Sequence, residues 1–142
     1  LINKKVIAAL DNGLIPILCV GETLGQREAG KTEAVVEGQL KNCLNGIKNE
    51  KIHTLIIAYE PVWAIGTGKN ASPEQAEEVH AFIRKNVAKL SGRDIAERVR
   101  IIYGGSMNDG NSKQLMASPN IDGGFVGGAS LYFERFLKII DS

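Results

Sequence analysis

The sequence predicts an α/β fold in which parallel strands alternate with helices. Short apolar runs alternate along the chain with segments whose apolar residues recur at helical spacing. The runs are almost entirely apolar, which is typical of parallel strands covered on both faces. Glycines follow the ends of the runs, where the chain must turn. Strand–helix alternation of this kind places every strand-to-helix loop at the same end of the sheet.

The elements follow one another as a helix and then about four strand–helix units. The first helix is predicted over residues 1–10 and ends at Asn12-Gly13. Strands are predicted over residues 14–20, 52–59, 99–103 and 121–126. The helices that follow them are predicted over residues 32–47, 72–90, 111–117 and 132–140.

Two of these helices carry strong sequence signals. Ser72-Pro73-Glu74-Gln75 is a helix start, with Ser72 as the cap, Pro73 at the first helical position and Gln75 completing a capping box. The last helix has an apolar stripe that we expect to face the core. The residues of this stripe are Phe133, Phe136, Leu137 and Ile140.

Composition limits the possible functions. The 142 residues carry a formal net charge of +1, which favours neither a nucleic-acid partner nor an acidic tail. No apolar run is long enough to span a membrane. Cys19 and Cys43 fit reduced, buried thiols of a cytoplasmic protein better than a disulfide. We treat residues 1–142 as one domain, or as part of a larger one.

Glu60 is the candidate catalytic residue. It lies at the end of a predicted strand, at the edge where α/β folds place their sites. Pro61 fixes the backbone after it, and Val62, Trp63 and Ile65 could cover it. A strand-end glutamate can also be an ordinary surface carboxylate, but its context favours a general base.

Glycine-rich loops at the same edge suggest a phosphate site. Gly66-Thr67-Gly68, Gly104-Gly105-Ser106 and Gly127-Gly128 follow three successive strands. Each pair alone is explained by turn geometry. Together, they offer backbone N–H groups and the Ser106 hydroxyl to a phosphate dianion.

The remaining titratable residues suggest no further chemistry. His53 is expected at the start of a strand and His80 within a helix, and we interpret both as structural or solvent-facing. No cluster of His, Cys, Asp or Glu has the spacing of metal ligands. The spacing of these residues therefore predicts no metal site.

Four motifs carry a resemblance to a known family. Residues 58–68, Ala-Tyr-Glu-Pro-Val-Trp-Ala-Ile-Gly-Thr-Gly, resemble the signature of triosephosphate isomerase. Cys19-Val20-Gly21-Glu22, Tyr103-Gly104-Gly105-Ser106 and residues 126–131 are similar to further motifs of this family, in the same order. The resemblance implies the C-terminal half of a TIM (β/α)8 barrel.

The resemblance also implies an activity and roles for residues. It implies interconversion of dihydroxyacetone phosphate and glyceraldehyde 3-phosphate through an enediolate, a reaction of glycolysis and gluconeogenesis, without a cofactor or a metal. It assigns Glu60 as the base. A glutamate base under a loop that closes over the substrate is an established feature of this family. The residues it assigns to the substrate phosphate are Gly66, Ser106, Gly127 and Gly128.

Further roles concern a lid over the site. Residues 61–63 and 69–71 resemble its two hinges. Glu22 resembles a partner of the lid tryptophan, Trp63, and Tyr103 resembles a latch.

The chain also departs from the family pattern. An Asn-x-Lys and a Gly-His-Ser-Glu-Arg segment, which supply a cation and a carbonyl-polarising histidine, are not in the sequence, and residues 107–111 are unusual. We therefore expect a piece of a longer chain that is inactive alone. Four parallel strands cannot close a barrel, so we expect association through open strand edges, as a homo-oligomer or with a complementing half-barrel, or poor folding. The alternative is a non-enzymatic half-barrel that binds phosphate or self-assembles.

Overall fold

The computed structural model describes residues 1–65 and 70–142. Its sheet contains β1 (Ile17–Val20), β2 (Ile56–Tyr59), β3 (Arg100–Tyr103) and β4 (Gly123–Gly124). Its helices are α1 (Ile2–Asp11), α2 (Leu24–Glu28), α3 (Thr32–Leu44), α4 (Asn49–Ile52), α5 (Pro73–Ser91), α6 (Arg93–Arg98), α7 (Ser112–Met116) and α8 (Phe133–Ile140). Short 3-10 turns span Val62–Ala64 and Gly128–Leu131.

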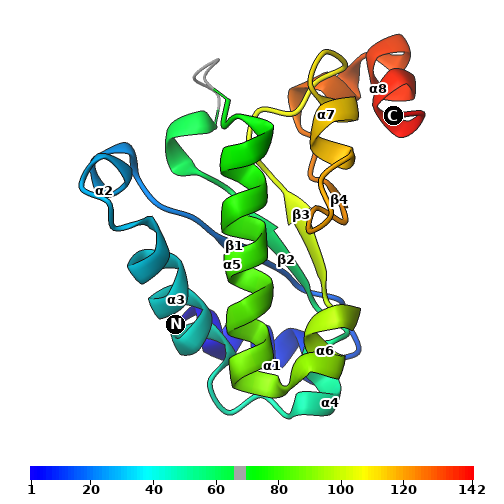
Figure 1. Ribbon diagram of the computed structural model, residues 1–142. Helices are drawn as coiled ribbons and strands as arrows, with labels where there is room; N and C mark the ends of the chain where they lie inside the picture. The colour runs from blue at the N-terminus through cyan, green and yellow to red at the C-terminus, as the bar shows by residue number, and fades with distance from the viewer. Residues whose placement is uncertain (66–69) are drawn as a thin grey trace.

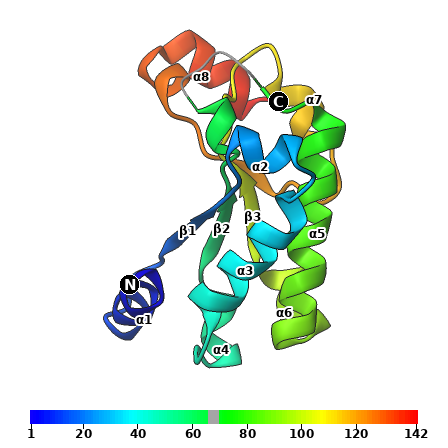
Figure 2. The same cartoon turned by 90° about the vertical axis from the view of Figure 1, so that its left-hand side faces the viewer.

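The four strands form one parallel sheet in the order β1-β2-β3-β4. The prediction of parallel strand–helix units is therefore confirmed. All four strands point toward the same end of the molecule, where α2, α7 and α8 lie (Figure 1). The opposite end holds α1, α4 and α6 (Figure 2). Side chains that follow the strands consequently gather at one end.

Helices cover one face of the sheet. Figure 2 shows α3 and α5 on the same side of the strands. Alternate strand residues point into this layer and are buried, because side chains of a strand alternate between faces. The buried strand residues on this face are Leu18, Val20, Ile57, Tyr59, Ile101 and Tyr103, which meet Leu40 of α3 and Ile83 of α5 in one core cluster.

The other face of the sheet is largely open in the described part of the chain, although Ala58 of β2 is buried there. Ile17, Cys19 and Arg100 are exposed on it, and Ile56 and Ile102 are partly exposed. The prediction that the strands are covered on both faces is therefore wrong for this structure. The prediction that Cys19 is buried is wrong for the same reason, and Cys43 is partly buried. Both cysteines are free.

Arg84 of α5 fixes the position of the last strand. Its Nη2 lies 2.7 Å from Asp122 Oδ2, and its Nη1 donates to the carbonyl of Ala96 at 2.7 Å. Asp122 Oδ2 also accepts a 2.6 Å hydrogen bond from the N–H of Ile101 in β3. One guanidinium thus joins α5, α6 and the residue before β4.

Several predicted boundaries are wrong. The first strand begins at Ile17, not at residue 14, and Leu14 is 63% exposed. Residues 49–52 form α4, so His53 ends a helix and does not open a strand. The fourth strand keeps only Gly123–Gly124 of the predicted 121–126. The helices α2 and α6 were not predicted.

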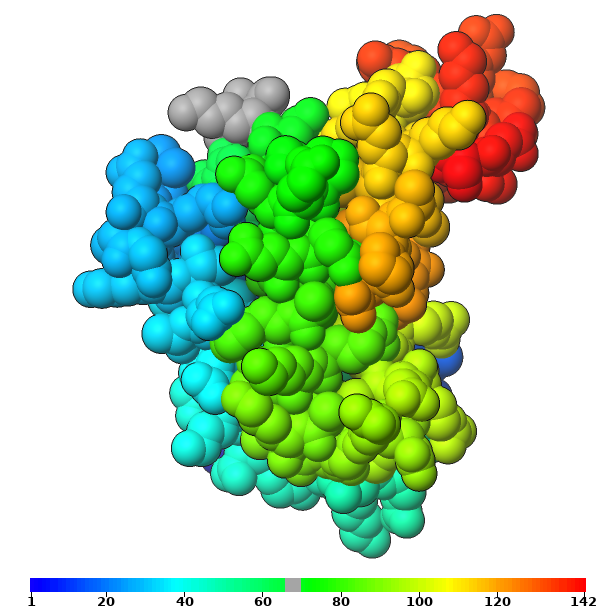
Figure 3. Space-filling model, in the orientation of Figure 1, coloured from blue at the N-terminus to red at the C-terminus, as the bar shows by residue number. Residues whose placement is uncertain are grey.

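The predicted apolar stripe of the last helix does not face the core. In α8, Phe133 is 79% exposed and Ile140 is 62% exposed, and the buried residue is Ile139. Figure 3 shows α8 at the periphery, whereas α5 runs over the middle of the face in view. The amphipathic pattern correctly predicted that these residues form a helix, but not that the apolar face of this helix stays exposed.

Candidate active site

A cavity of about 640 Å³ lies where the strands end. Four of its lining residues are the predicted site residues Glu60, Ser106, Gly127 and Gly128. Ile65, Phe125 and Arg135 also line it. The fifth predicted residue, Gly66, lies outside the described residues. The topology explains why these residues lie together, since parallel strands bring their carboxyl ends to one edge of the sheet.

Glu60 is half-buried and held by two glycines. Its N–H donates to the carbonyl of Val20 at 2.8 Å, which continues the pairing of β2 with β1. A Cβ on Gly104 would lie 2.5 Å from Glu60 Cγ, and a Cβ on Gly21 would overlap the carbonyl of Glu60. The glycines are required here by the close approach of Glu60, not by an unusual backbone conformation.

Cys19 is a neighbour of Glu60 that sequence reasoning did not associate with it. Although Cys19 is exposed as a whole residue, partial desolvation of its thiol, and then the charge of Glu60 and a hydrogen bond to it, raise the pKa of Cys19 to about 11. The thiol is therefore protonated at neutral pH and can donate to the carboxylate. No sequence signal marks this contact, because it joins β1 to the residue that follows β2.

Ser106 joins the loop after β3 to the segment after Glu60. Its Oγ donates a 2.6 Å hydrogen bond to the carbonyl of Ala64, in the 3-10 turn. The Ser106 carbonyl accepts from Asn111 Nδ2 at 2.9 Å, and Asn111 Oδ1 accepts from the N–H of Asn108 at 2.8 Å. The unusual loop of residues 107–111 thus holds Ser106 in place.

Gly127 and Gly128 form the side of the cavity beyond β4. Both are exposed, and a Cβ built on either would meet no heavy atom of residues 1–65 and 70–142 within 4 Å. The described residues therefore leave room for a ligand beside these two glycines. Phe125 and Val126 precede them in the cavity wall.

Glu22 is a fully buried carboxylate beneath the segment after Glu60. Its Oε1 accepts a 3.0 Å hydrogen bond from Trp63 Nε1, and its Oε2 accepts one of 3.1 Å from the hydroxyl of Tyr59. Burial, and then the charge of Glu22, raise the pKa of Tyr59, so this hydroxyl stays protonated and donates. The predicted partnership of Glu22 with Trp63 is present as a direct contact.

Tyr103, the predicted latch, contacts the segment that leads into α5. Its hydroxyl accepts a 3.3 Å hydrogen bond from the N–H of Ala71, on the far side of the residues that are not described. Burial raises the pKa of Tyr103. Gly105 is also required, because a Cβ at that position would overlap the Tyr103 hydroxyl.

His80 is structural, as predicted, but it is more deeply placed than its sequence context suggested. It is fully buried, and its ring lies 5.8 Å from that of Tyr59 and 6.3 Å from that of Tyr103. It stands behind the strands, away from the cavity lining. Within residues 1–65 and 70–142, no group of three His, Cys, Asp or Glu residues could hold a metal ion.

Comparison with known proteins shows which family the chain belongs to. The family model described as "Triosephosphate isomerase" matches residues 1–142. The chain belongs to the triosephosphate isomerase family. The predicted resemblance is therefore confirmed, and the parallel α/β sheet is consistent with half of the family's barrel.

Individual members of the triosephosphate isomerase family are closely similar to this chain. A protein of that name from Carboxydothermus hydrogenoformans is 57% identical over 140 residues, which cover 99% of this chain and 56% of the relative. Those from Rhodopirellula baltica and Chloroherpeton thalassium are each 54% identical, and 55% and 56% of their lengths are covered. The chain thus spans little more than half the length of these triosephosphate isomerases.

Two features of the site were missed by the sequence analysis. Arg27 contacts both Glu22 and Trp63, yet α2, which carries it, was not predicted. A signal existed, because Thr23 and Gln26 have the spacing of a capping box and form one in the structure. The contact between Cys19 and Glu60 had no such signal.

Proposed function

We propose that this chain forms the proton-transfer half of a triosephosphate isomerase site. The observation that supports the proposal most strongly is the shared cavity of Glu60, Ser106, Gly127 and Gly128. It combines a carboxylate with hydroxyl and backbone donors within reach of one small ligand. The substrates are dihydroxyacetone phosphate and glyceraldehyde 3-phosphate, interconverted in glycolysis and gluconeogenesis.

In the proposed reaction, the Glu60 carboxylate removes a proton from the carbon next to the substrate carbonyl. The C–H electron pair forms the enediolate, and Glu60 then returns the proton to the neighbouring carbon. No electrons are gained or lost overall, so no redox cofactor enters the reaction. The substrate changes from ketose to aldose, or the reverse.

The phosphate of the substrate is assigned to Gly66, Ser106, Gly127 and Gly128. Backbone N–H groups suit a phosphate dianion, and no side chain of the described residues fills the space where a Cβ of Gly127 or Gly128 would lie. The Ser106 hydroxyl already donates to Ala64. Binding through this hydroxyl therefore requires the Ala64 contact to be exchanged, whereas the Ser106 N–H can donate without that change.

We propose that residues 1–142 do not catalyse this reaction alone. The family motifs that supply a lysine to balance the substrate charge and a histidine to polarise its carbonyl are not in this sequence. His80 cannot take the place of that histidine, because it lies in the core. A missing electrostatic donor commonly costs a factor of about 10² to 10³ in kcat. The complete site accordingly needs residues beyond these 142.

The alternative function is a half-barrel that binds phosphate or self-assembles without catalysis. The open sheet face and the outer strands β1 and β4 favour association. We propose a homo-oligomer or a pairing with a complementing half-barrel, in the cytoplasm, where free cysteines such as Cys19 and Cys43 persist. In the described part of the chain, no helix could cross a bilayer.

Glu60→Gln tests the catalytic proposal. Measured in a polypeptide that also carries the missing motifs, this variant should lower kcat by a factor of about 10² or more, since it removes the base. Binding of inorganic phosphate should persist, because Glu60 is not assigned to the phosphate. Glu97→Gln, at an exposed position of α6 at the other end of the molecule, is the matched control.

The outcomes separate the two functions. Unchanged kcat in Glu60→Gln would remove this residue from the role of base. Phosphate binding without turnover in the unsubstituted polypeptide would favour the non-enzymatic half-barrel. Turnover by residues 1–142 alone would contradict the proposal that they lack essential groups.

A further inference from the structure

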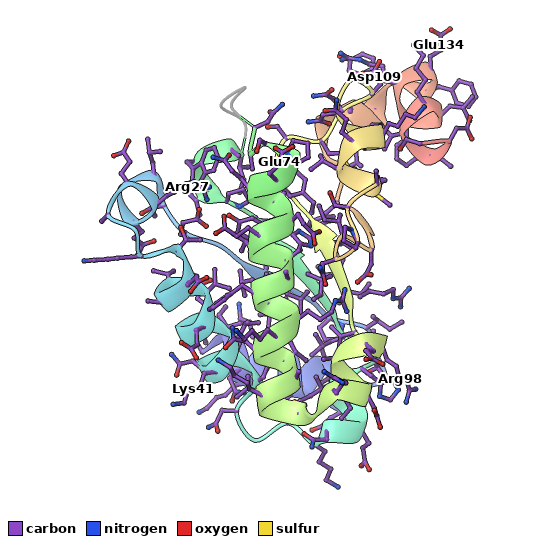
Figure 4. All side chains as sticks on the ribbon, viewed as in Figure 1. Arg27, Lys41, Glu74, Arg98, Asp109 and Glu134 are labelled. Atoms are coloured by element: carbon purple, nitrogen blue, oxygen red, sulfur yellow. The ribbon has the colours of Figure 1, made fainter. Side chains whose placement is uncertain are left out.

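Arg27 lies in the short helix α2, beside the site but outside its cavity. The helix is held by the Thr23–Gln26 capping box, and the side chain of Arg27 is 22% exposed. In Figure 4, Arg27 lies at the same end of the molecule as Glu74, the second residue of α5. Neither the family motifs nor the proposed reaction gives Arg27 a role.

The guanidinium of Arg27 makes two contacts at once. Its Nη1 lies 3.1 Å from Oε1 of the buried Glu22. Its central carbon lies 5.1 Å from the centroid of the Trp63 ring. Trp63 Nε1 donates to the same Oε1, at 3.0 Å. The three side chains therefore form a closed triangle, in which each contacts the other two.

The physical chemistry of the triangle makes Arg27 hard to replace. Glu22 is fully buried, and a buried carboxylate requires hydrogen bonds and a compensating charge. Arg27 supplies that charge. A guanidinium is also planar and stacks on aromatic faces, whereas the ammonium of lysine is a compact point charge. Arginine can therefore both pair with Glu22 and stack on Trp63, whereas lysine can supply only the charge.

The triangle acts on the backbone next to Glu60. Trp63 is the middle residue of the 3-10 turn Val62–Ala64, which begins two residues after Glu60. The N–H of Val62 donates to the carbonyl of Glu22 at 3.0 Å. The direction in which the chain leaves Glu60 is consequently tied to Glu22 through both its backbone and the Trp63 side chain.

We propose that Arg27 is a positioning residue: by stacking on Trp63 and pairing with Glu22, it fixes the orientation of residues 61–65 and so of the cover over Glu60. This inference rests on the proposed isomerase function for its effect on turnover. Its structural half, the orientation of Trp63, does not. The competing explanation is that the ion pair merely anchors α2 to the body of the molecule.

The test uses the indole N–H of Trp63 as a reporter. In ¹⁵N-labelled protein, the Trp63→Phe variant identifies this resonance, since Trp63 is the only tryptophan among the 142 residues. Arg27→Gln should shift the resonance and speed its exchange with water by about tenfold or more, the factor expected when a hydrogen bond to a charged group is weakened. Arg27→Lys should give an intermediate shift, because it retains the charge without the stacking plane.

Arg98→Gln is the matched control. Arg98 is exposed in α6, at the opposite end of the molecule from Arg27 (Figure 4). It should leave the indole resonance unchanged. Thermal melting of all variants shows how much of any change is a loss of stability. An Arg27→Gln protein that melts earlier while its indole resonance stays in place would show a simple anchor and overturn the proposal.

The effect on turnover is measured in the polypeptide that carries the complete site. Arg27→Gln should lower kcat by about 10-fold to 100-fold, as misplacement of a catalytic segment does, and change KM much less. Equal kcat in Arg27→Gln and Arg98→Gln would contradict the positioning role. If the unsubstituted polypeptide itself shows no turnover, the isomerase function fails, while the indole measurement still decides whether Arg27 orients Trp63.

Discussion

The helices α5 and α8 are both amphipathic, but of the two only α5 buries its apolar face. The apolar face of α5 lies on the sheet, and Ile83 and Val87 are completely buried there. The apolar face of α8 is largely exposed at the periphery of the molecule (Figure 3). An apolar stripe therefore predicts that a helix needs a partner surface, and says nothing about which part of the structure supplies it.

The N-terminus of α5 is also better stabilised than that of α8. Ser72 Oγ accepts from the N–H of Gln75 at 3.2 Å, and Gln75 Oε1 accepts from the N–H of Ser72 at 3.0 Å, so α5 has a complete capping box. At the start of α8, Tyr132 makes no side-chain cap. The local sequence of α5 thus supports a helix that packing also stabilises, while α8 has no side-chain cap and little of its apolar face is packed.

The largest expected difference between the helices comes from matched isoleucines. Ile83→Ala in α5 should lower the free energy of unfolding by about 2–5 kcal/mol, because it leaves a cavity in a packed core. Ile140→Ala in α8 should change it by about 0.5 kcal/mol or less, since this side chain is 62% exposed. Urea denaturation of both variants checks the contrast. Equal losses would show that the face of α8 is covered in solution.

A second difference concerns His80, a polar residue on the buried face of α5. Burial lowers its pKa to about 4, although the carbonyl of Asn120 and the charge of Asp122 act in the opposite direction. Its Nδ1 lies 3.3 Å from the Asn120 carbonyl, which can only accept, so Nδ1 carries the proton of the neutral ring. The folded state therefore prefers neutral His80.

This preference predicts how stability depends on pH. The folded pKa lies below the unfolded value of 6.5, so the stabilisation from neutral His80 is fully present above pH 6.5. It should be lost as the pH falls from 6.5 toward 4, by about 3 kcal/mol at most. Denaturation curves at several pH values measure it, and His80→Leu should flatten the profile in this window. A profile of equal slope in His80→Leu would assign the effect to other groups.

The smallest expected difference lies at the caps. Ser72→Ala should lower the free energy of unfolding by about 1 kcal/mol, because it leaves the N–H of Gln75 without its acceptor. Tyr132→Ala, at the start of α8, should have a smaller effect, since no cap is lost. Thermal melting of the two variants is sufficient for the comparison. A larger loss in Tyr132→Ala would mean that α8 is more firmly packed than its exposure indicates.

The site shows the same division between local and non-local information. Glu60, Ser106, Gly127 and Gly128 were placed together from the sequence because each follows a strand, and parallel strands end at one edge. Arg27 and Cys19 were missed because their contacts with Trp63 and Glu60 join separate parts of the fold. His80 was placed correctly in a helix, but its position behind Tyr59 and Tyr103 depends on how α5 packs.

The sequence by itself determined the order of the strand–helix units, their parallel direction and the residues that reach the edge holding Glu60. These follow from periodicities and turn signals within a few residues of each other, and from the direction of the chain. Only the tertiary structure decided which apolar faces are covered, where α8 lies and which side chains surround Glu22. Such contacts join residues far apart in the chain, as Arg27 and Trp63 are, so their energies leave no periodic signal in the sequence.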